Sequence, residues 1–99
     1  MKNTNALFQP HFFSVLMHSN KINVVKTKDE AIKLIIKDIR EGSPDQCYAI
    51  YKGWYKPQNP PIFSGNSWGL SSYLEETGDS VNHERIMHIN RGAVLGMMG

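Results

Sequence analysis

Residues 27–42 have the sequence TKDEAIKLIIKDIREG and predict the principal helix of the domain. Thr27 and Glu30 have the spacing of a capping box, in which each side chain accepts a hydrogen bond from a free amide at the helix start. Behind them, isoleucines follow the i, i+3, i+4 and i+7 spacing of one helix face, at Ile32, Ile35, Ile36 and Ile39. Gly42 is expected to end the helix. The pattern therefore predicts an amphipathic helix that covers a sheet.

Strand-like segments lie on both sides of this helix. His11–His18 and Ile22–Lys26 are rich in bulky and β-branched residues, and the polar turn Ser19–Lys21 separates them. This arrangement is typical of a β-hairpin. Gln46–Lys56 alternates with apolar bulk on both faces, as expected for a central strand.

The C-terminal part of the chain is less regular. Prolines and glycines favour a long loop over residues 57–69. Ser72 and Glu75 repeat the capping-box spacing, so Ser72–Thr77 is expected to form a short helix. His83–Asn90 alternates in polarity and predicts a last strand. The apolar tail Ala93–Met98 is expected either to pack on the sheet or to form a partner or self-association surface.

These elements predict an α+β fold. One principal amphipathic helix would pack on an antiparallel or mixed sheet of about four strands, with a short second helix. Residues 1–10 are expected to form a flexible N-terminal arm, and residues 11–99 a single domain. The composition, 40% hydrophobic and 20% charged over 99 residues, is that of a globular domain.

The net charge of +2 is unevenly distributed along the chain. Up to Arg40 there are seven basic and three acidic residues (7 − 3 = +4), and the remainder has four and six (4 − 6 = −2). This asymmetry favours an acidic partner for the first half, or only a solvated helix face. Cys47 is the single cysteine, so an intrachain disulfide is excluded. With no signal-like or membrane-spanning apolar run, a cytoplasmic protein is expected.

Catalytic and metal-binding chemistry has little support in the sequence. Cys47 is expected in a buried strand, where a thiol is a poor nucleophile. On a strand, His83 and His88 would lie on opposite faces, as would His11 and His18, so no metal site is predicted. No catalytic residue, metal or cofactor is assigned, and the chain is expected not to be an enzyme. A small enzyme built on Cys47 or the histidines is the least favoured class.

The aromatic and basic segment from Tyr51 to Trp68 is the strongest candidate for binding. Its rings would either fill the core, bind a protein, or stack on the bases of a single strand. The predicted partner-binding residues are Lys52, Trp54, Tyr55, Lys56, Phe63 and Trp68. A secondary basic face on the helix consists of Lys33, Lys37 and Arg40.

We expect a non-enzymatic protein-binding module. Its size and type suit a stoichiometric inhibitor or accessory protein of a phage or mobile element, which would occlude a host or defence protein. The alternative is a single-stranded nucleic-acid-binding module that combines the rings with the basic face. The apolar tail allows a homo-oligomer in either case.

Overall fold

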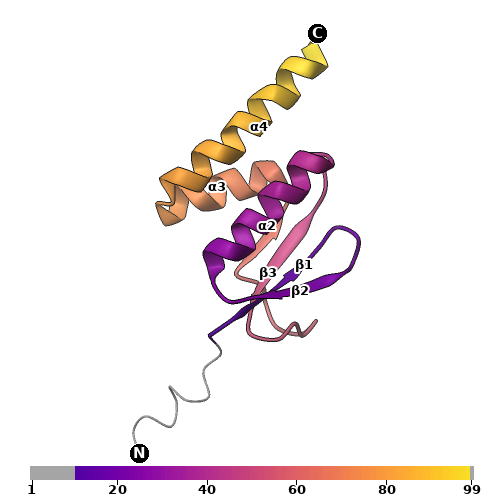
Figure 1. The fold of residues 1–99 in the computed structure, drawn as a ribbon, viewed down its shortest axis with the longest axis vertical. Helices are drawn as coiled ribbons and strands as arrows, with labels where there is room; N and C mark the ends of the chain where they lie inside the picture. The colour runs from indigo at the N-terminus through magenta and orange to yellow at the C-terminus, as the bar shows by residue number, and fades with distance from the viewer. Residues whose placement is uncertain (1–10, 99) are drawn as a thin grey trace, which may run out of the picture.

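The computed structural model describes residues 11–98 and shows an α+β fold, as predicted (Figure 1). The residues of the predicted N-terminal arm, 1–10, lie outside the described range. Four strands and three helices follow one another as β1 (Phe13–Leu16), β2 (Ile22–Val25), α2 (Lys28–Glu41), β3 (Tyr48–Lys52), β4 (Phe63–Gly65), α3 (Ser67–Thr77) and α4 (Ser80–Met98).

Helix α2 forms as its sequence predicts. The Thr27 side chain accepts a hydrogen bond from the Glu30 amide, and the Glu30 carboxylate accepts one from the Thr27 amide, which completes the capping box. At the other end, the Gly42 amide donates to the carbonyls of Asp38 and Ile39. The predicted apolar stripe is buried in full, as Ala31, Ile32, Ile35, Ile36 and Ile39.

The sheet is antiparallel throughout, in the order β2-β1-β3-β4. Strand β3 is central, as its two apolar faces predict. Val15 on β1 pairs with Ile50 on β3, and Ile50 pairs with Phe63 on β4. These three cross-strand neighbours are buried and lie in the hydrophobic core together with the α2 isoleucines. One face of the sheet therefore forms the floor of the core.

Helices α2, α3 and α4 all contribute to that core. Leu70 and Leu74 of α3 and Ile86 of α4 are fully buried in it. The hydroxyl of the buried Tyr48 donates a hydrogen bond to the Asp38 carboxylate, which ties the start of β3 to α2. Burial is the larger cause and this hydrogen bond the next, and together they raise the pKa of Tyr48 well above its usual range.

The opposite face of the sheet has a different character. The buried Ser14 hydroxyl donates to the Gly53 carbonyl at 2.6 Å, and the ring of Tyr51 packs edge-on against Tyr55. Towards the β2 edge, the side chains of Ile22 and Val24 are exposed. Among the described residues, the core is therefore on the helix side of the sheet.

The structure corrects the expected loop over residues 57–69. Phe63–Gly65 form strand β4, and α3 begins at Ser67 instead of Ser72. The cap is Asn66, whose side chain accepts hydrogen bonds from the amides of Trp68 and Gly69. The Ser72 hydroxyl lies inside the helix, where it donates to the Trp68 carbonyl. Gly78 ends the helix as expected, in the left-handed conformation (φ 78°).

The predicted last strand, His83–Asn90, is wrong, because these residues lie within helix α4. The predicted tail, Ala93–Met98, is the end of the same helix. In the helix, every fourth residue faces the core: Asn82, Ile86 and Asn90 are all at most 1% exposed. Two of the three are polar, so the core-facing side lacks the apolar stripe that usually marks a helix.

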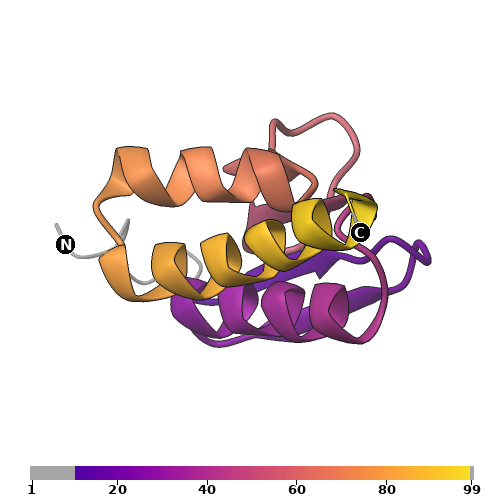
Figure 2. The same cartoon turned by 90° about the horizontal axis from the view of Figure 1, so that it is seen from above.

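Helix α4 lies between α3 and α2 when the domain is viewed along its long axis (Figure 2). It contacts both helices, and its C-terminal end projects beyond the rest of the fold (Figure 1). Within residues 11–98, no helix has the length and apolar character needed to cross a membrane.

Candidate interaction surfaces on the two sides of helix α4

The six predicted partner-binding residues do not form one surface. Strand β3 runs from Tyr48 to Lys52, and Trp54 lies just beyond Lys52. Trp68 lies beyond the other end of the strand, because Tyr48 pairs with Gly65 of β4. A five-residue strand is about 13 Å long. The two indoles therefore belong to opposite ends of the sheet and do not share a hot spot.

Four of the six residues lie at the Lys52 end. Trp54 is 66% exposed, and its ring packs edge-on against Phe12 with the centroids 4.8 Å apart. Tyr55 is half-buried, while Lys52 and Lys56 are exposed. This end is thus an aromatic and basic surface.

Phe63, one of the six predicted partner-binding residues, is a core residue. It is 5% exposed, and its ring centroid lies 5.4 Å from that of Tyr73 in α3. Strand β4 turns this ring towards the helices, where a partner does not reach it.

Trp68 lies in a groove of about 360 Å³ between α3 and α4. We call it the apolar groove, and its lining residues are Trp68, Met87, Asn90, Arg91, Val94 and Leu95. Trp68 is 40% exposed and Leu95 is 68% exposed. Large apolar side chains in water that surround a hollow are typical of an interaction site.

Buried polar atoms lie beside the apolar groove. The Asn90 side chain donates to the Ser67 carbonyl at 3.4 Å, but its carboxamide oxygen has no hydrogen-bond partner among residues 11–98. The Ser67 hydroxyl is also without a partner in this part of the chain. A buried polar group left unpaired costs about 1–3 kcal/mol, so this side of α4 is not optimised for stability alone.

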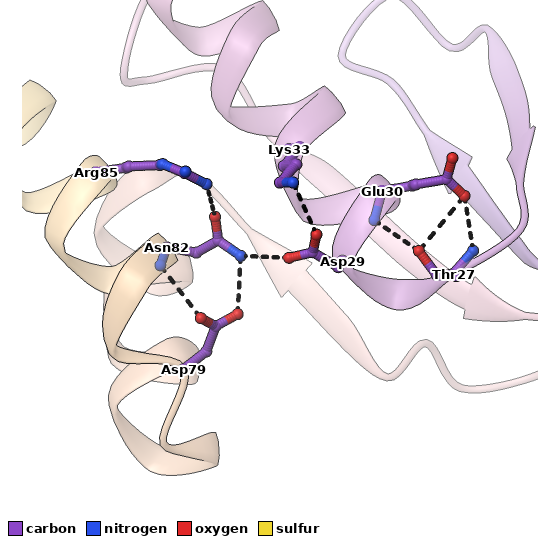
Figure 3. Close-up of polar contacts among 7 residues, drawn as sticks. All are labelled: Thr27, Asp29, Glu30, Lys33, Asp79, Asn82 and Arg85. Carbon is purple, nitrogen blue, oxygen red and sulfur yellow. Dashed lines mark hydrogen bonds and ion pairs between the residues drawn. The ribbon is translucent and has the colours of Figure 1, made fainter.

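A polar network sets the position of α4 against α2 (Figure 3). Asp79 precedes the helix, and its carboxylate accepts a hydrogen bond from the backbone amide of Asn82. The Asn82 side chain donates to Asp79 and also to Asp29 at the start of α2, both at 2.8 Å. Its oxygen accepts a bond from the Arg85 guanidinium at 2.8 Å. Every polar group of this buried amide is paired, so the network fixes the start of α4.

The same network changes the acidity of Asp29. Hydrogen bonds from Asn82 and then from Lys33, 3.1 Å away, lower the pKa of the Asp29 carboxyl. Asp29 therefore stays ionised to lower pH than usual and keeps its bond to Asn82.

The other side of α4 is cationic. Two adjoining hollows of about 250 and 430 Å³ lie between α2 and α4 and share Arg40 and Arg85. We call them together the cationic groove, lined by Lys33, Ile36, Lys37 and Arg40 of α2 and by Val81, Glu84, Arg85 and His88 of α4. The predicted basic face of α2 is thus one wall of a groove, and α4 supplies the other.

The residues that α4 contributes to both grooves were not predicted from the sequence. Because His83–Asn90 was expected to be a strand, Arg85 and Met87 were not placed on a helix surface, and Arg91 was not assigned to any element. A helical spacing was present in the sequence: Met87, Arg91, Val94 and Leu95 are separated by four, three and one residues. Only the tail residues among them were recognised as apolar and unexplained.

The expectation that Cys47 is buried is wrong. Cys47 is exposed just before β3, and its amide donates to Nδ1 of His18 at 3.1 Å. The thiol lies 3.8 Å from the Asp45 carbonyl. In the described part of the chain, no group of three or more His, Cys, Asp or Glu residues is placed to hold a metal ion.

No protein-family model, curated protein or solved structure matches this chain.

Proposed function

We propose that this domain acts by binding another protein through the apolar groove, as a stoichiometric inhibitor or accessory protein. The observation that supports this most strongly is the group of apolar side chains around one hollow. Trp68, Met87, Val94 and Leu95 come from two helices and surround about 360 Å³. A tryptophan beside a pocket is the usual centre of a binding hot spot.

The chemistry of the groove indicates what kind of segment it would bind. Its apolar lining suits an aliphatic or aromatic side chain of the partner. Arg91 belongs to the lining and forms only a long, exposed ion pair of 3.5 Å with Glu84. Its guanidinium is available to a carboxylate, so we propose a partner segment with an apolar anchor beside an acidic residue.

The alternative of single-stranded nucleic acid on the rings and the basic face has less support. Asp38 of α2 contacts Tyr48, so the neighbouring Arg40 lies near the Tyr48 end of the sheet. Trp54 lies beyond the Lys52 end. A strand held by both would have to cross the length of the domain.

Pull-down from an extract of the source cells, followed by titration with the captured protein, tests the proposal. The variants are Leu95→Ser and, as the matched control, Trp54→Ala. Both side chains are about two-thirds exposed, at 68% and 66%, so neither change should unfold the domain. We expect Leu95→Ser to weaken binding by at least about tenfold and Trp54→Ala to leave it unchanged.

Two results would contradict the proposal. Equal binding by the wild type and Leu95→Ser would exclude the apolar groove. A wild-type dimer that dissociates on Leu95→Ser, measured by sedimentation, would assign the groove to a second copy of this chain instead.

A further inference from the structure

The cationic groove is the second surface that the fold builds around α4, and the proposed protein-binding groove does not use it. Four of its lining residues carry a full positive charge, namely Lys33, Lys37, Arg40 and Arg85. Its one lining carboxylate is Glu84, which leaves a charge of 4 − 1 = +3 on the lining. The groove therefore has an excess of positive charge in a domain whose net charge is only +2.

The cations of the groove are largely available to a ligand. Among residues 11–98, Lys37 and Arg40 have no carboxylate within ion-pair distance. Arg85 donates one hydrogen bond, to the buried Asn82, which holds its guanidinium in place. An arginine has five N–H donors, so most of the Arg85 donors remain free for an anion.

The dimensions of the groove suit a row of phosphates. Lys33, Lys37 and Arg40 follow the i, i+4 and i+7 spacing of one helix face, a length of about 10 Å at 1.5 Å per residue. Phosphates along one strand of a duplex recur about every 3.4 Å of helix axis, so the wall covers about three of them.

The lining residues also indicate how the ligand is recognised. No Phe, Tyr or Trp lines the groove, and the imidazole of His88 is its one aromatic ring. Stacking on aromatic rings is the main source of single-strand affinity, whereas contacts from Lys and Arg to phosphates need no unstacked base. The lining thus favours a paired backbone over splayed bases.

We propose that the cationic groove binds the phosphate backbone of a nucleic acid duplex without reading its sequence. Arg85 and Arg40 form the centre of the site, because both line the two hollows. Lys33 and Lys37 extend it along α2.

Fluorescence anisotropy with a labelled DNA duplex of about 20 base pairs tests this proposal. The test variant is the double change Lys37→Ala with Arg40→Ala, on the exposed side of α2. The control is Lys21→Ala with Lys56→Ala, two exposed lysines outside the groove, which removes the same charge. We expect the test variant to bind at least about tenfold more weakly and the control within about twofold of the wild type.

Salt dependence gives a second readout. If four phosphates are neutralised, log K should fall with log salt with a slope of about −3.6, and the test variant should lose about half of that slope. The same titration is repeated with the matching single strand and with poly-glutamate.

Three outcomes would overturn the proposal. The first is no duplex binding at about 50 mM salt, and the second is an equal loss in both double variants. The third is binding of the single strand or of poly-glutamate as tight as that of the duplex, since it would point to a different class of polyanion.

Discussion

The side-chain amide of Asn82 donates a hydrogen bond of 2.8 Å to the carboxylate of Asp29, 53 residues earlier in the chain. This bond joins the first turn of α4 to the first turn of α2. Both proposed surfaces depend on it, because α4 forms one wall of the apolar groove and one wall of the cationic groove.

Asn82→Ala should lower the free energy of unfolding by about 2–3 kcal/mol. The change removes two bonds to carboxylates and leaves Asp29, Asp79 and Arg85 without a shared partner. Urea unfolding measures the effect. Lys33→Ala is the control, because its ion pair with Asp29 is exposed and should contribute less than about 1 kcal/mol. Equal losses in the two variants would contradict the role given to Asn82.

Asp29 should make stability depend on acid pH. Its pKa in the folded protein is lowered from its ordinary value of 3.8, chiefly by the bond from Asn82. The stability that ionised Asp29 adds to the folded protein is therefore fully present above pH 3.8 and is lost as the pH falls through the folded-state pKa of Asp29. The measurement compares the unfolding midpoints of the wild type and Asp29→Asn from pH 6 downward, in steps of about one unit. The gap between the two proteins should narrow below about pH 4, and a constant gap would refute the linkage.

Gly92→Ala and Gly78→Ala should change stability in opposite directions. At both positions an added methyl group meets no atom within 4 Å, so packing does not decide the result. Gly92 lies inside α4, where alanine should stabilise the helix by about 0.5–1 kcal/mol. Gly78 has a φ of 78°, where alanine is strained and should cost about 1 kcal/mol. Thermal unfolding compares the two variants. A change of the unfolding temperature in the same direction for both would contradict the backbone conformation given for Gly92 or for Gly78.

The tryptophan fluorescence should be red-shifted and readily quenched by acrylamide. Both indoles contact water, and Trp54 is the more exposed, at 66% against 40% for Trp68. Trp68→Phe, which leaves only Trp54, should therefore give the stronger quenching, and Trp54→Phe the weaker. Blue-shifted, protected emission from the Trp68→Phe variant would mean that the loop after β3 buries Trp54.

The sequence predicted α2 completely because each local signal agrees with the tertiary structure. The capping residues, the isoleucine stripe and Gly42 all favour the same helix, and the core needs that helix to cover the sheet. The central position of β3 was predicted for a similar reason. Apolar bulk on both faces of a strand has few explanations other than burial on both sides.

Helix α4 could not be predicted in this way, because some of its polar side chains are buried and some of its apolar side chains are exposed. Its core-facing side carries Asn82 and Asn90, while Val94 and Leu95 are exposed. Hydrophobic periodicity detects a helix by its buried apolar side chains. In α4, two of the buried side chains are asparagines, which hydrogen-bond to residues distant in sequence. Asn82 is buried because its side chain bonds to Asp29, and a contact between residues so far apart in sequence leaves no local pattern.

The candidate site was predicted in part for the same reason. Trp68 was among the predicted partner-binding residues, and the structure places it in the apolar groove, whose other lining residues come from α4. Phe63 was predicted to bind a partner as part of the aromatic and basic segment, although it pairs with Ile50 in a short strand. Strands of three residues have too few alternations to be detected from sequence.

Strand β2 lies at the edge of the sheet, with Ile22 and Val24 exposed on its outer face. An edge strand offers unpaired backbone groups to any other chain, and apolar side chains make such pairing favourable. Lys21 and Lys26 flank the strand, one at each end, and both are exposed. Their like charges would meet whenever two copies aligned edge to edge in either direction. Repulsion between these lysines would oppose edge-to-edge pairing of two copies, and salt that screens the charges would weaken this repulsion.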